Sequence, residues 1–333
     1  MRTFIALFFS FLVVVGYSQE KKYVTVKKNI TLMGESFGIT VVAVNEELGY
    51  INIEEATAEI NRINKLISSW DSDSETYKIN VNAGVKPVKV KTELFALIER
   101  AIQIAEITDG AFDITFASTE NVWKFNGEMK YPPTKEENKS SIKNVGYKNI
   151  LLDKEKQTVF LKKKGMRISF GAIGKGYAVD KAKALLMSNQ VIAGVINASG
   201  DITTWGTKVS GEKWLLGVAD PASNYKILTW LPILESSAST TDVYEKYVSF
   251  KGQKYGHIID PRTGAPVRGL KKATVFAKSA ELCDALATAV LVLGLDKGVS
   301  LINQLGGTEA IFIDDNNKIY KTNGLILDNV ILK

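Results

Sequence analysis

The stretch ATVFAKSAELCDALATAVLVLG, residues 273–294, places a short β-branched run directly before a long apolar one. We predict a strand over 273–276 and a helix over 280–293, because the second run is too long for an ordinary strand and ends at Gly294. The helix is apolar except at a few positions, which include Asp284 and Thr288. The fold is therefore expected to contain both strands and apolar helices.

Around this stretch, strands and helices follow one another without the regular alternation of a doubly wound sheet. Further helices are predicted at 53–67, 92–108 and 176–187. Further strands are predicted at 23–30, 39–44, 150–152, 158–161, 167–170, 191–197, 214–218, 226–231, 247–250 and 310–313. Residues 132–141 are rich in Pro, Lys, Glu and Asn and are expected to be a surface insertion. The mixture predicts an α+β fold in a single large mixed domain.

The N-terminal residues have the features of a secretory signal. Arg2 precedes an apolar run from Phe4 to Val15, and small residues surround Tyr17. We predict a signal peptide over 1–18 and a mature domain over 19–333, exported to the periplasm or to the outer face of the cytoplasmic membrane. The alternative is a retained membrane anchor, although roughly a dozen apolar residues fall short of the ~20 that cross a bilayer.

The cysteine content argues against a disulfide-stabilised protein, and the charge distribution argues against a nucleic-acid-binding protein. Cys283 is the only cysteine, so no internal disulfide can form. The net charge of +6 comes from scattered lysines, without the dense basic blocks interleaved with aromatics that nucleic-acid binders show. We expect no nucleic-acid partner, and a solvated basic surface that mildly favours an anionic substrate.

Asp284 and Thr288 are four residues apart in the predicted helix, so their oxygens share one face. A carboxylate and a hydroxyl on an apolar helix are costly to bury unless something satisfies them, and Mg²⁺ takes such oxygen ligands. The alternative is that Asp284 pairs with a buried lysine and Thr288 bonds back to its own helix. The spacing alone leaves both interpretations open.

Residues 171–180, GAIGKGYAVD, form a glycine-rich turn that leads directly into a helix. Small residues let backbone amides approach an anion, the helix N-terminus adds a positive dipole end, and Lys175 adds a full charge. The segment matches neither the Walker loop nor the GxGxxG fingerprint. It is typical of a phosphate site or, alternatively, of a plain strand-to-helix turn.

Residues 255–264, YGHIIDPRTG, predict a strand that ends in a sharp polar turn. His257 is the only histidine of the chain, and an imidazole titrates near neutrality. It is a candidate general base, with a structural hydrogen-bonding role as the alternative.

Small polar clusters end several other apolar runs, and each is also consistent with a capped helix or a plain turn. They are Met33-Gly34, residues 110–115, residues 197–201 and residues 239–242. Trp70 stands in a polar loop, where it could stack on an aromatic ligand or cover the core.

Six of these clusters, in this order, resemble the motifs of the ApbE family of flavin transferases, from Met33 to about Gly294. The family motifs are MGT, GxFD-T, D-LGGIAKGYAVD, N-GGD, HI-DPRTG and DALAT-LFVLG. The most specific matches are HIIDPRTG at 257–264 and DALAT at 284–288. The resemblance implies mainly antiparallel sheets with flanking helices.

The resemblance also implies an activity: Mg²⁺-dependent transfer of FMN from FAD to a threonine hydroxyl of an acceptor protein, forming a phosphoester and releasing AMP. The acceptor would be a membrane redox-pump subunit or another exported flavoprotein. Asp284, Thr288 and the main-chain carbonyl of Ala172 would hold Mg²⁺, with His257 as the catalytic residue. The implied FAD contacts are Met33, Trp70, Ala111, Phe112, Asp113, Ser169, Lys175, Ile258 and Ile259.

The chain departs from the family pattern at three places. Ser169 replaces the aspartate before LGG and cannot carry a charge, Glu35 replaces the threonine of MGT, and 239–241 is Ser-Thr-Thr at a TSG-like segment. Two other functions remain in view: an FAD pyrophosphatase that yields FMN and AMP, and a non-catalytic exported FAD-binding protein. A pure binder would need neither a metal site nor a base.

Overall fold

The computed structural model describes residues 22–125, 129–220 and 223–326, so the predicted signal peptide lies outside the described residues. Its centre is an eight-stranded sheet in which every neighbouring pair is antiparallel. In spatial order the strands are β1 (Val24–Leu32), β2 (Glu35–Ala43), β6 (Ala193–Ala198), β7 (Asp201–Trp205), β10 (Ser237–Asp242), β13 (Leu270–Ala277), β14 (Glu309–Asp314) and β15 (Ile319–Lys321). The α+β prediction with mainly antiparallel sheets is confirmed.

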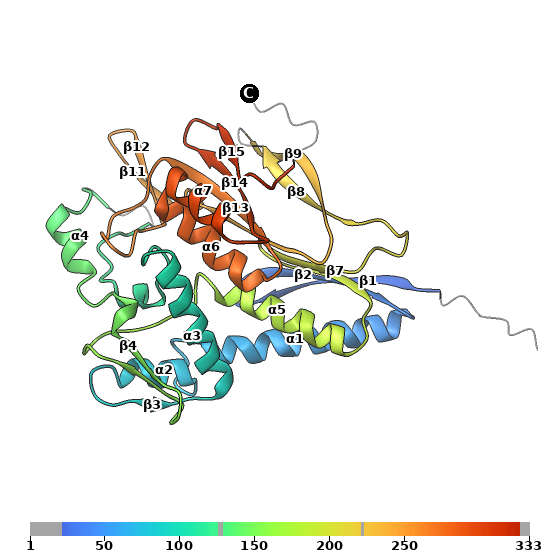
Figure 1. The fold of residues 1–333 in the computed structure, drawn as a ribbon, viewed down its shortest axis with the longest axis horizontal. Coiled ribbons are helices and arrows are strands. Elements are labelled where there is room, and N and C mark those ends of the chain that lie inside the picture. The colour runs from blue at the N-terminus through green and yellow to red at the C-terminus, as the bar shows by residue number, and fades with distance from the viewer. Residues whose placement is uncertain (1–21, 126–128, 221–222, 327–333) are drawn as a thin grey trace, which may run out of the picture.

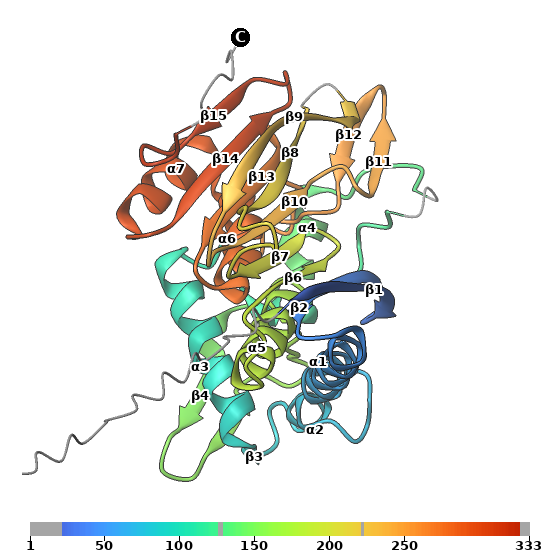
Figure 2. The same cartoon turned by 90° about the vertical axis from the view of Figure 1, so that its right-hand side faces the viewer.

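Four helices cover one face of this sheet (Figures 1 and 2). They are α1 (Glu46–Ile67), α5 (Gly174–Ser188), α6 (Ala280–Leu293) and α7 (Leu295–Gln304). Helix α1 packs on β1 and β2, α5 on β6 and β7, α6 on β10 and β13, and α7 on β14. Because α5 also packs on α6, the helices form a continuous layer, and the core lies between this layer and the sheet.

The other face of the sheet carries a two-stranded ribbon of β8 (Trp214–Asp220) and β9 (Ser223–Ile233). The apolar residues Val218 and Ile233 of the ribbon cluster with Ile202, Ala238 and Phe276 of the sheet. A separate hairpin, β11 (Tyr247–Phe250) and β12 (Gln253–Gly256), projects beside the ribbon (Figure 2). The sheet is therefore covered by apolar contacts on both faces.

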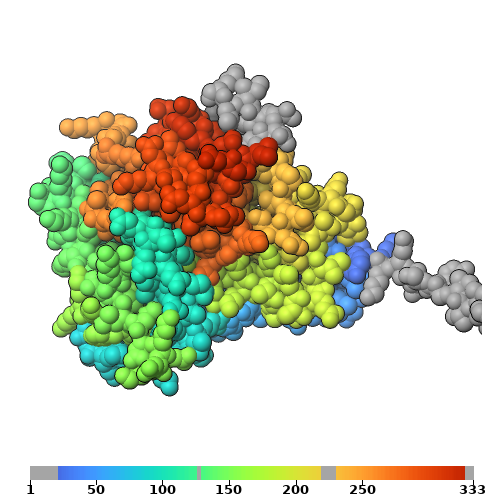
Figure 3. Space-filling view, in the orientation of Figure 1, coloured from blue at the N-terminus to red at the C-terminus, as the bar shows by residue number. Residues whose placement is uncertain are grey.

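A second layer of structure lies beyond α1 and α5. It contains α2 (Glu75–Val81), α3 (Thr92–Ile107) and a small sheet of β3 (Val88–Lys89), β5 (Thr158–Leu161) and β4 (Ile150–Asp153). The short helices η1 (Ile114–Ser118) and η2 (Tyr147–Asn149) belong to it, whereas α4 (Lys135–Ser141) lies apart, where Asn138 closely approaches Gly264 (Figure 1). In Figure 3, α3 (teal) and neighbouring segments (green) form the surface below the C-terminal helices (red and orange).

Three local predictions differ most from the structure: helix α1 begins at Glu46 rather than at residue 53, the strand expected within 255–264 ends at Gly256, and 167–170 is not a strand. Residues 167–170 form no strand, because their amides bond outside any ladder: Ile168 donates to Asn80 Oδ1 at 2.8 Å and Ser169 donates to the carbonyl of Ile114 at 3.0 Å. The expected surface insertion contains helix α4, which begins at a capping box between Thr134 and Glu137. Within the described ranges, no helix is both long and apolar enough to cross a membrane.

Candidate active site

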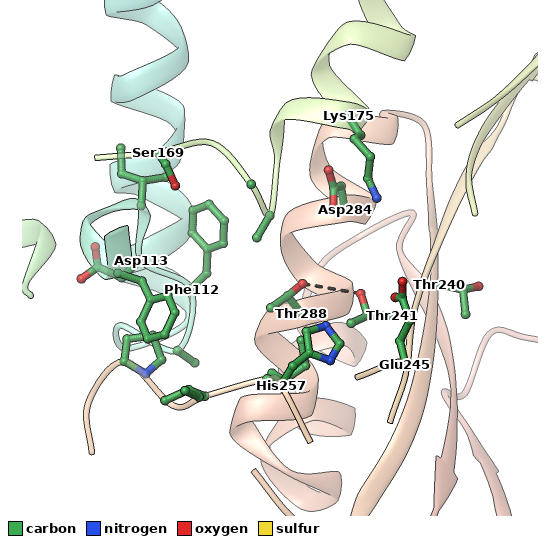
Figure 4. Close-up of a pocket in the computed structure, with 18 of the residues that line it drawn as sticks. Phe112, Asp113, Ser169, Lys175, Thr240, Thr241, Glu245, His257, Asp284 and Thr288 are labelled. Carbon is green, nitrogen blue, oxygen red and sulfur yellow. Dashed lines mark hydrogen bonds between the residues drawn. The ribbon is translucent and has the colours of Figure 1, made fainter. Parts of the chain in front are cut away.

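A cavity of about 350 Å³ opens where α6, the start of α5, the η1 segment and the 257–261 segment meet (Figure 4). Its lining residues are Ala111, Phe112, Asp113, Ile114, Phe116, Ser169, Gly171, Ala172, Lys175, Ser199, Thr240, Thr241, Glu245, His257, Ile258, Ile259, Pro261, Asp284 and Thr288. Lys175 and Asp284 lie at one end, and His257 lies with Thr288 and Thr241 farther along α6. Polar groups from distant parts of the chain thus share one cavity.

Asp284 is a buried carboxylate of α6 whose side chain faces the N-terminal turn of α5. Its side chain is almost fully covered, and Oδ2 accepts the backbone amide of Gly176 at 3.1 Å. Burial raises the pKa of Asp284 well above its usual value, and the nearby Asp201 raises it further. A positive charge at this position would therefore stabilise the ionised carboxylate strongly. Of the backbone amides in the glycine-rich turn, that of Gly176 is thus already bound to Asp284.

Gly176 makes this approach possible because it has no side chain. A Cβ at this position would lie 2.2 Å from the carbonyl oxygen of Ala280, in the first turn of α6. The backbone of α5 therefore lies directly against α6, and its amide reaches Asp284. Only glycine fits this contact without moving one of the two helices.

Thr288 is one helical turn beyond Asp284 on the same face of α6. Its Oγ1 lies 3.5 Å from Oγ1 of Thr241, which comes from β10 (Figure 4). This contact crosses from the helix to the sheet, whereas the alternative interpretation placed the bond within α6. The two hydroxyls and Asp284 together present oxygen ligands to the cavity.

Lys175 is held between two carboxylates. Its Nζ lies 3.0 Å from Oδ2 of the buried Asp201, whose other oxygen accepts the hydroxyl of Ser239. Burial alone would lower the pKa of Lys175, but the charges of Asp201 and Asp284 outweigh burial and raise it. The ammonium therefore stays charged at neutral pH. Lys175 thus makes its ion pair with Asp201, while the charge of Asp284 acts on it from nearby.

His257 is half-buried at the edge of the cavity. Its backbone amide is bound by the carbonyls of Val243 at 3.2 Å and Lys246 at 3.0 Å, and Nδ1 lies 3.2 Å from the same Val243 carbonyl. A carbonyl can only accept, so this contact requires a proton on Nδ1 and selects the Nδ1–H tautomer of the neutral ring. That tautomer leaves the lone pair on Nε2 available to accept a proton.

Asp113 supports the cavity wall from behind. Its Oδ1 accepts the amide of Thr115 at 2.8 Å and the hydroxyl of Thr115 at 2.6 Å, and Oδ2 accepts the amide of Tyr147 at 2.8 Å. Figure 4 shows its carboxylate on the side of Phe112 that faces away from His257. Its side chain thus shapes the wall that Phe112 presents to the cavity.

All the residues predicted for the site line this cavity except Met33 and Trp70. Met33 is the first residue of the β1–β2 turn, with a φ of 53°, and packs against the core. Trp70 is 77% exposed in the loop after α1. The roles predicted for both residues stay predictions.

Several lining residues were not singled out from the sequence. Glu245 carried no motif signal at all. Thr240 and Thr241, and the buried Asp201 behind Lys175, belong to polar clusters that were candidates from the sequence, with plain turns or caps as the alternative, but no individual role was predicted for these three residues. Their contribution depends on the pairing of β7 with β10, which brings Asp201 opposite Ser239.

The donor set fits a hard divalent cation. Asp284 is a carboxylate with few partners, and the hydroxyls of Thr288 and Thr241 and the backbone of Ala172 lie on the same cavity. Within the described ranges, no group of three or more His, Cys, Asp or Glu side chains could hold a metal. A cation here would therefore be held by one carboxylate with hydroxyl and carbonyl oxygens, a set that suits Mg²⁺.

The fold and the cavity define an α+β protein with an oxygen-rich cation site, a fixed lysine and an imidazole around one pocket. The model of the ApbE family matches residues 33–312. The chain therefore belongs to the ApbE family, and the resemblance predicted from the motifs is confirmed.

Individual relatives extend the match over most of the chain. A protein of Treponema pallidum described as an FAD:protein FMN transferase is 28% identical over 289 residues, covering 82% of this chain and 80% of that protein. A Vibrio cholerae protein with the same description is 26% identical over 332 residues, covering 96% and 97%. The crystal structure of an ApbE protein from Thermotoga maritima superposes with a TM-score of 0.81 at 30% identity, covering 90% of this chain and 97% of the other.

Proposed function

We propose that this chain is an exported, Mg²⁺-dependent FAD:protein FMN transferase, which moves FMN from FAD to a threonine hydroxyl of an acceptor protein and releases AMP. The observation that carries the proposal is the single cavity shared by Asp284, Lys175 and His257. Family membership and the relatives described as FAD:protein FMN transferases support it. Export is supported by the signal-like residues 1–18. An exported enzyme would meet acceptor proteins that are themselves exposed outside the cytoplasm.

The cation site and Lys175 would neutralise the substrate. Asp284 and Thr288, with the carbonyl of Ala172, would hold Mg²⁺, which supplies charge stabilisation for the pyrophosphate oxygens. Lys175, fixed by Asp201 at 3.0 Å, adds a second positive charge on the same side of the cavity. Neutralised oxygens lower the barrier to nucleophilic attack on an otherwise stable anion.

The imidazole of His257 would accept the proton of the acceptor threonine at Nε2. The threonine oxygen then forms a bond to the FMN-side phosphorus, and the bond from that phosphorus to the bridging oxygen breaks. The electron pair leaves with AMP. The Nδ1 contact to Val243 holds the ring in the tautomer that this step needs.

The flavin would lie along the apolar part of the cavity. Phe112 and Ile258 present apolar surface there, and the hydroxyl of Ser169 can exchange hydrogen bonds with the ligand without adding charge. Ala111, Asp113 and Ile259 belong to the same wall, whereas Met33 and Trp70 would have to contact parts of FAD that extend beyond the cavity.

One incubation tests the proposal: the protein with FAD, Mg²⁺ and a threonine-bearing exported subunit of a membrane redox pump. We expect flavin fluorescence on the acceptor band and stoichiometric AMP. Free FMN in place of labelled acceptor would identify a pyrophosphatase, and intact FAD would identify a binding protein.

The variant Asp284→Ala should lose Mg²⁺ dependence and activity together. The matched control is Asp296→Ala, which removes an exposed carboxylate from α7, outside the cavity. Full activity of Asp284→Ala would remove the metal site from the proposal.

A further inference from the structure

A second cavity, of about 530 Å³, lies next to the first and has no role in the chemistry described above. It is formed by the β11–β12 hairpin, the end of β10 and the start of β13; the hairpin is the orange projection at the upper left of Figure 3. Its lining residues are Asp242, Tyr244, Tyr247, Gln253, Lys254, Arg268, Lys271, Lys272, Ile313 and Asp315. We refer to this cavity as the hairpin groove.

The hairpin groove and the active-site cavity share one wall, the segment 243–246. His257 is fixed to this segment through the carbonyls of Val243 and Lys246. Along it, Glu245 lines the active-site cavity, whereas Tyr244 lines the hairpin groove. A chain that lay in the groove would therefore need to cross only this segment to reach His257.

The charge of the hairpin groove is positive. Four cationic side chains line it against two carboxylates. Both carboxylates are already engaged by the protein: Asp242 pairs with Lys272 at 3.2 Å, and Asp315 accepts the hydroxyl of Tyr244 and the amide of Gly269, each at 2.9 Å. The net charge that the lining side chains present to a ligand is therefore positive.

Two of the cations lie at the open side of the groove. Lys254 lies 4.3 Å from the ring centre of Tyr247, and Arg268 lies 4.6 Å from that of Tyr255. Both side chains are exposed, and in the described part of the chain neither forms an ion pair with a carboxylate. Resting on aromatic faces orients the cations but does not neutralise them, so they remain able to bind an anion.

Lys271, deeper in the groove, shows the effect of the crowded cations. Burial lowers its pKa and the charge of the neighbouring Lys272 lowers it further, and together these outweigh the opposite effect of the Asp242, Asp315 and Asp314 carboxylates. A bound anion would relieve this repulsion. The carboxylate of Glu245 lies on the other side of the shared wall, in the active-site cavity. It would repel an anionic segment from that cavity and so favour binding of the segment in the hairpin groove.

We propose that the hairpin groove binds an acidic segment of the acceptor protein, close in sequence to the threonine that receives FMN. Lys254 and Arg268 would pair with its carboxylates, and the threonine would cross the 243–246 segment to reach His257. The inference rests on the proposed transferase function, because only a transferase needs a second, macromolecular substrate. FAD would lie in the active-site cavity, where Lys175 and the cation site already meet its negative charge.

The test uses the full mature chain and two fluorescein-labelled peptides. Both carry one central threonine, flanked by aspartates in one peptide and by asparagines in the other. The double variant Lys254→Glu/Arg268→Glu reverses the open side of the groove, and Lys162→Glu/Lys164→Glu reverses two exposed lysines elsewhere as a control of equal charge change. Fluorescence anisotropy gives peptide affinity, and FAD binding is measured in parallel.

The wild type and the control should bind the aspartate peptide about tenfold tighter than the asparagine peptide, and the preference should weaken with added salt. The groove variant should lose the preference while FAD affinity stays unchanged. Equal binding of both peptides by the wild type, or an undiminished preference in the groove variant, would overturn the proposal. A loss of FAD affinity in the groove variant would also overturn it and assign the groove to the nucleotide.

Peptide binding is independent of turnover, so the two proposals fail separately. A chain that neither cleaves FAD nor labels an acceptor would refute the transferase function even if the aspartate peptide bound. A chain that labels an acceptor but ignores the peptide charge would refute the groove alone.

Discussion

Asp180 of α5 accepts the backbone amide of Ala280 at 2.9 Å, so one helix caps the N-terminus of the next. Its second oxygen accepts the amide of Glu281 at 2.9 Å and the hydroxyl of Ser279, the N-cap residue, at 2.7 Å. These contacts satisfy amides that a helix start leaves without partners. Because Asp284 is one turn farther along α6, the cap also sets the position of the cation site.

Replacing Asp180 by alanine should therefore affect stability and metal use together. Loss of the cap is expected to lower the free energy of unfolding by roughly 1–2 kcal/mol, and to raise the Mg²⁺ concentration needed for half-maximal FAD turnover. Urea unfolding and a Mg²⁺ titration measure the two effects. Asp180→Asn keeps one acceptor oxygen and should recover part of both, whereas an unchanged Mg²⁺ requirement in Asp180→Ala would restrict the residue to a purely structural role.

Gly176→Ala should separate the two helices at the same place. The added Cβ would lie 2.2 Å from the carbonyl oxygen of Ala280, so α5 and α6 must move apart and the amide of Gly176 must leave Asp284. We expect loss of Mg²⁺-dependent activity with a lower melting temperature. Gly306→Ala is the matched control, because a Cβ there meets no atom within 4 Å and the residue lies outside the cavity. Equal behaviour of the two variants would contradict the close-contact explanation.

His257→Ala should reduce FMN transfer by a factor on the order of 10² to 10⁴, the usual contribution of a general base. FAD affinity should change little, because the cation site and Lys175 meet the pyrophosphate independently of the imidazole. Single-turnover transfer and equilibrium FAD binding separate the two effects. Transfer at the wild-type rate would reject His257 as the proton acceptor.

The sequence predicted some elements well because their signals are local. The strongly apolar helix α6 was expected over the residues that form it, and α3 to within one residue. Strands β7 and β10 were missed because DITTW and SASTTD resemble polar turns. In the sheet their hydroxyls bond across strands, as between Thr203 and Ser237 at 2.8 Å, so polar side chains are tolerated inside.

The site follows the same division. Asp284, Lys175 and His257 stand in short sequence motifs, so these residues could be predicted without a structure. Asp201 and Thr241 act only through neighbours that the strand order β7–β10–β13 and the packing of α6 bring to them. Such contacts between distant segments have no periodicity or spacing in the sequence, so local patterns did not reveal them.

The last prediction concerns stability in acid. Glu93 accepts Nη1 of Arg62 at 2.6 Å, Nη2 at 2.9 Å and the hydroxyl of Tyr177 at 2.9 Å, and the bonds from Arg62 are the largest cause that lowers the pKa of Glu93 to about 2. Because the pKa is lowered in the folded state, the ionised Glu93 contributes fully to the free energy of unfolding above pH 4.5, the ordinary value for a glutamate. This stabilisation disappears as the pH falls toward 2.

Glu93→Gln should therefore lower the free energy of unfolding at pH 7 by on the order of 1 kcal/mol, after allowance for solvent screening of a partly exposed pair. The difference from wild type should shrink steadily between pH 4.5 and pH 2. Urea unfolding at several pH values measures it, with the exposed Glu155→Gln as control. A difference that stays constant down to pH 2 would show that packing against Tyr177, rather than the carboxylate charge, is what the substitution removes.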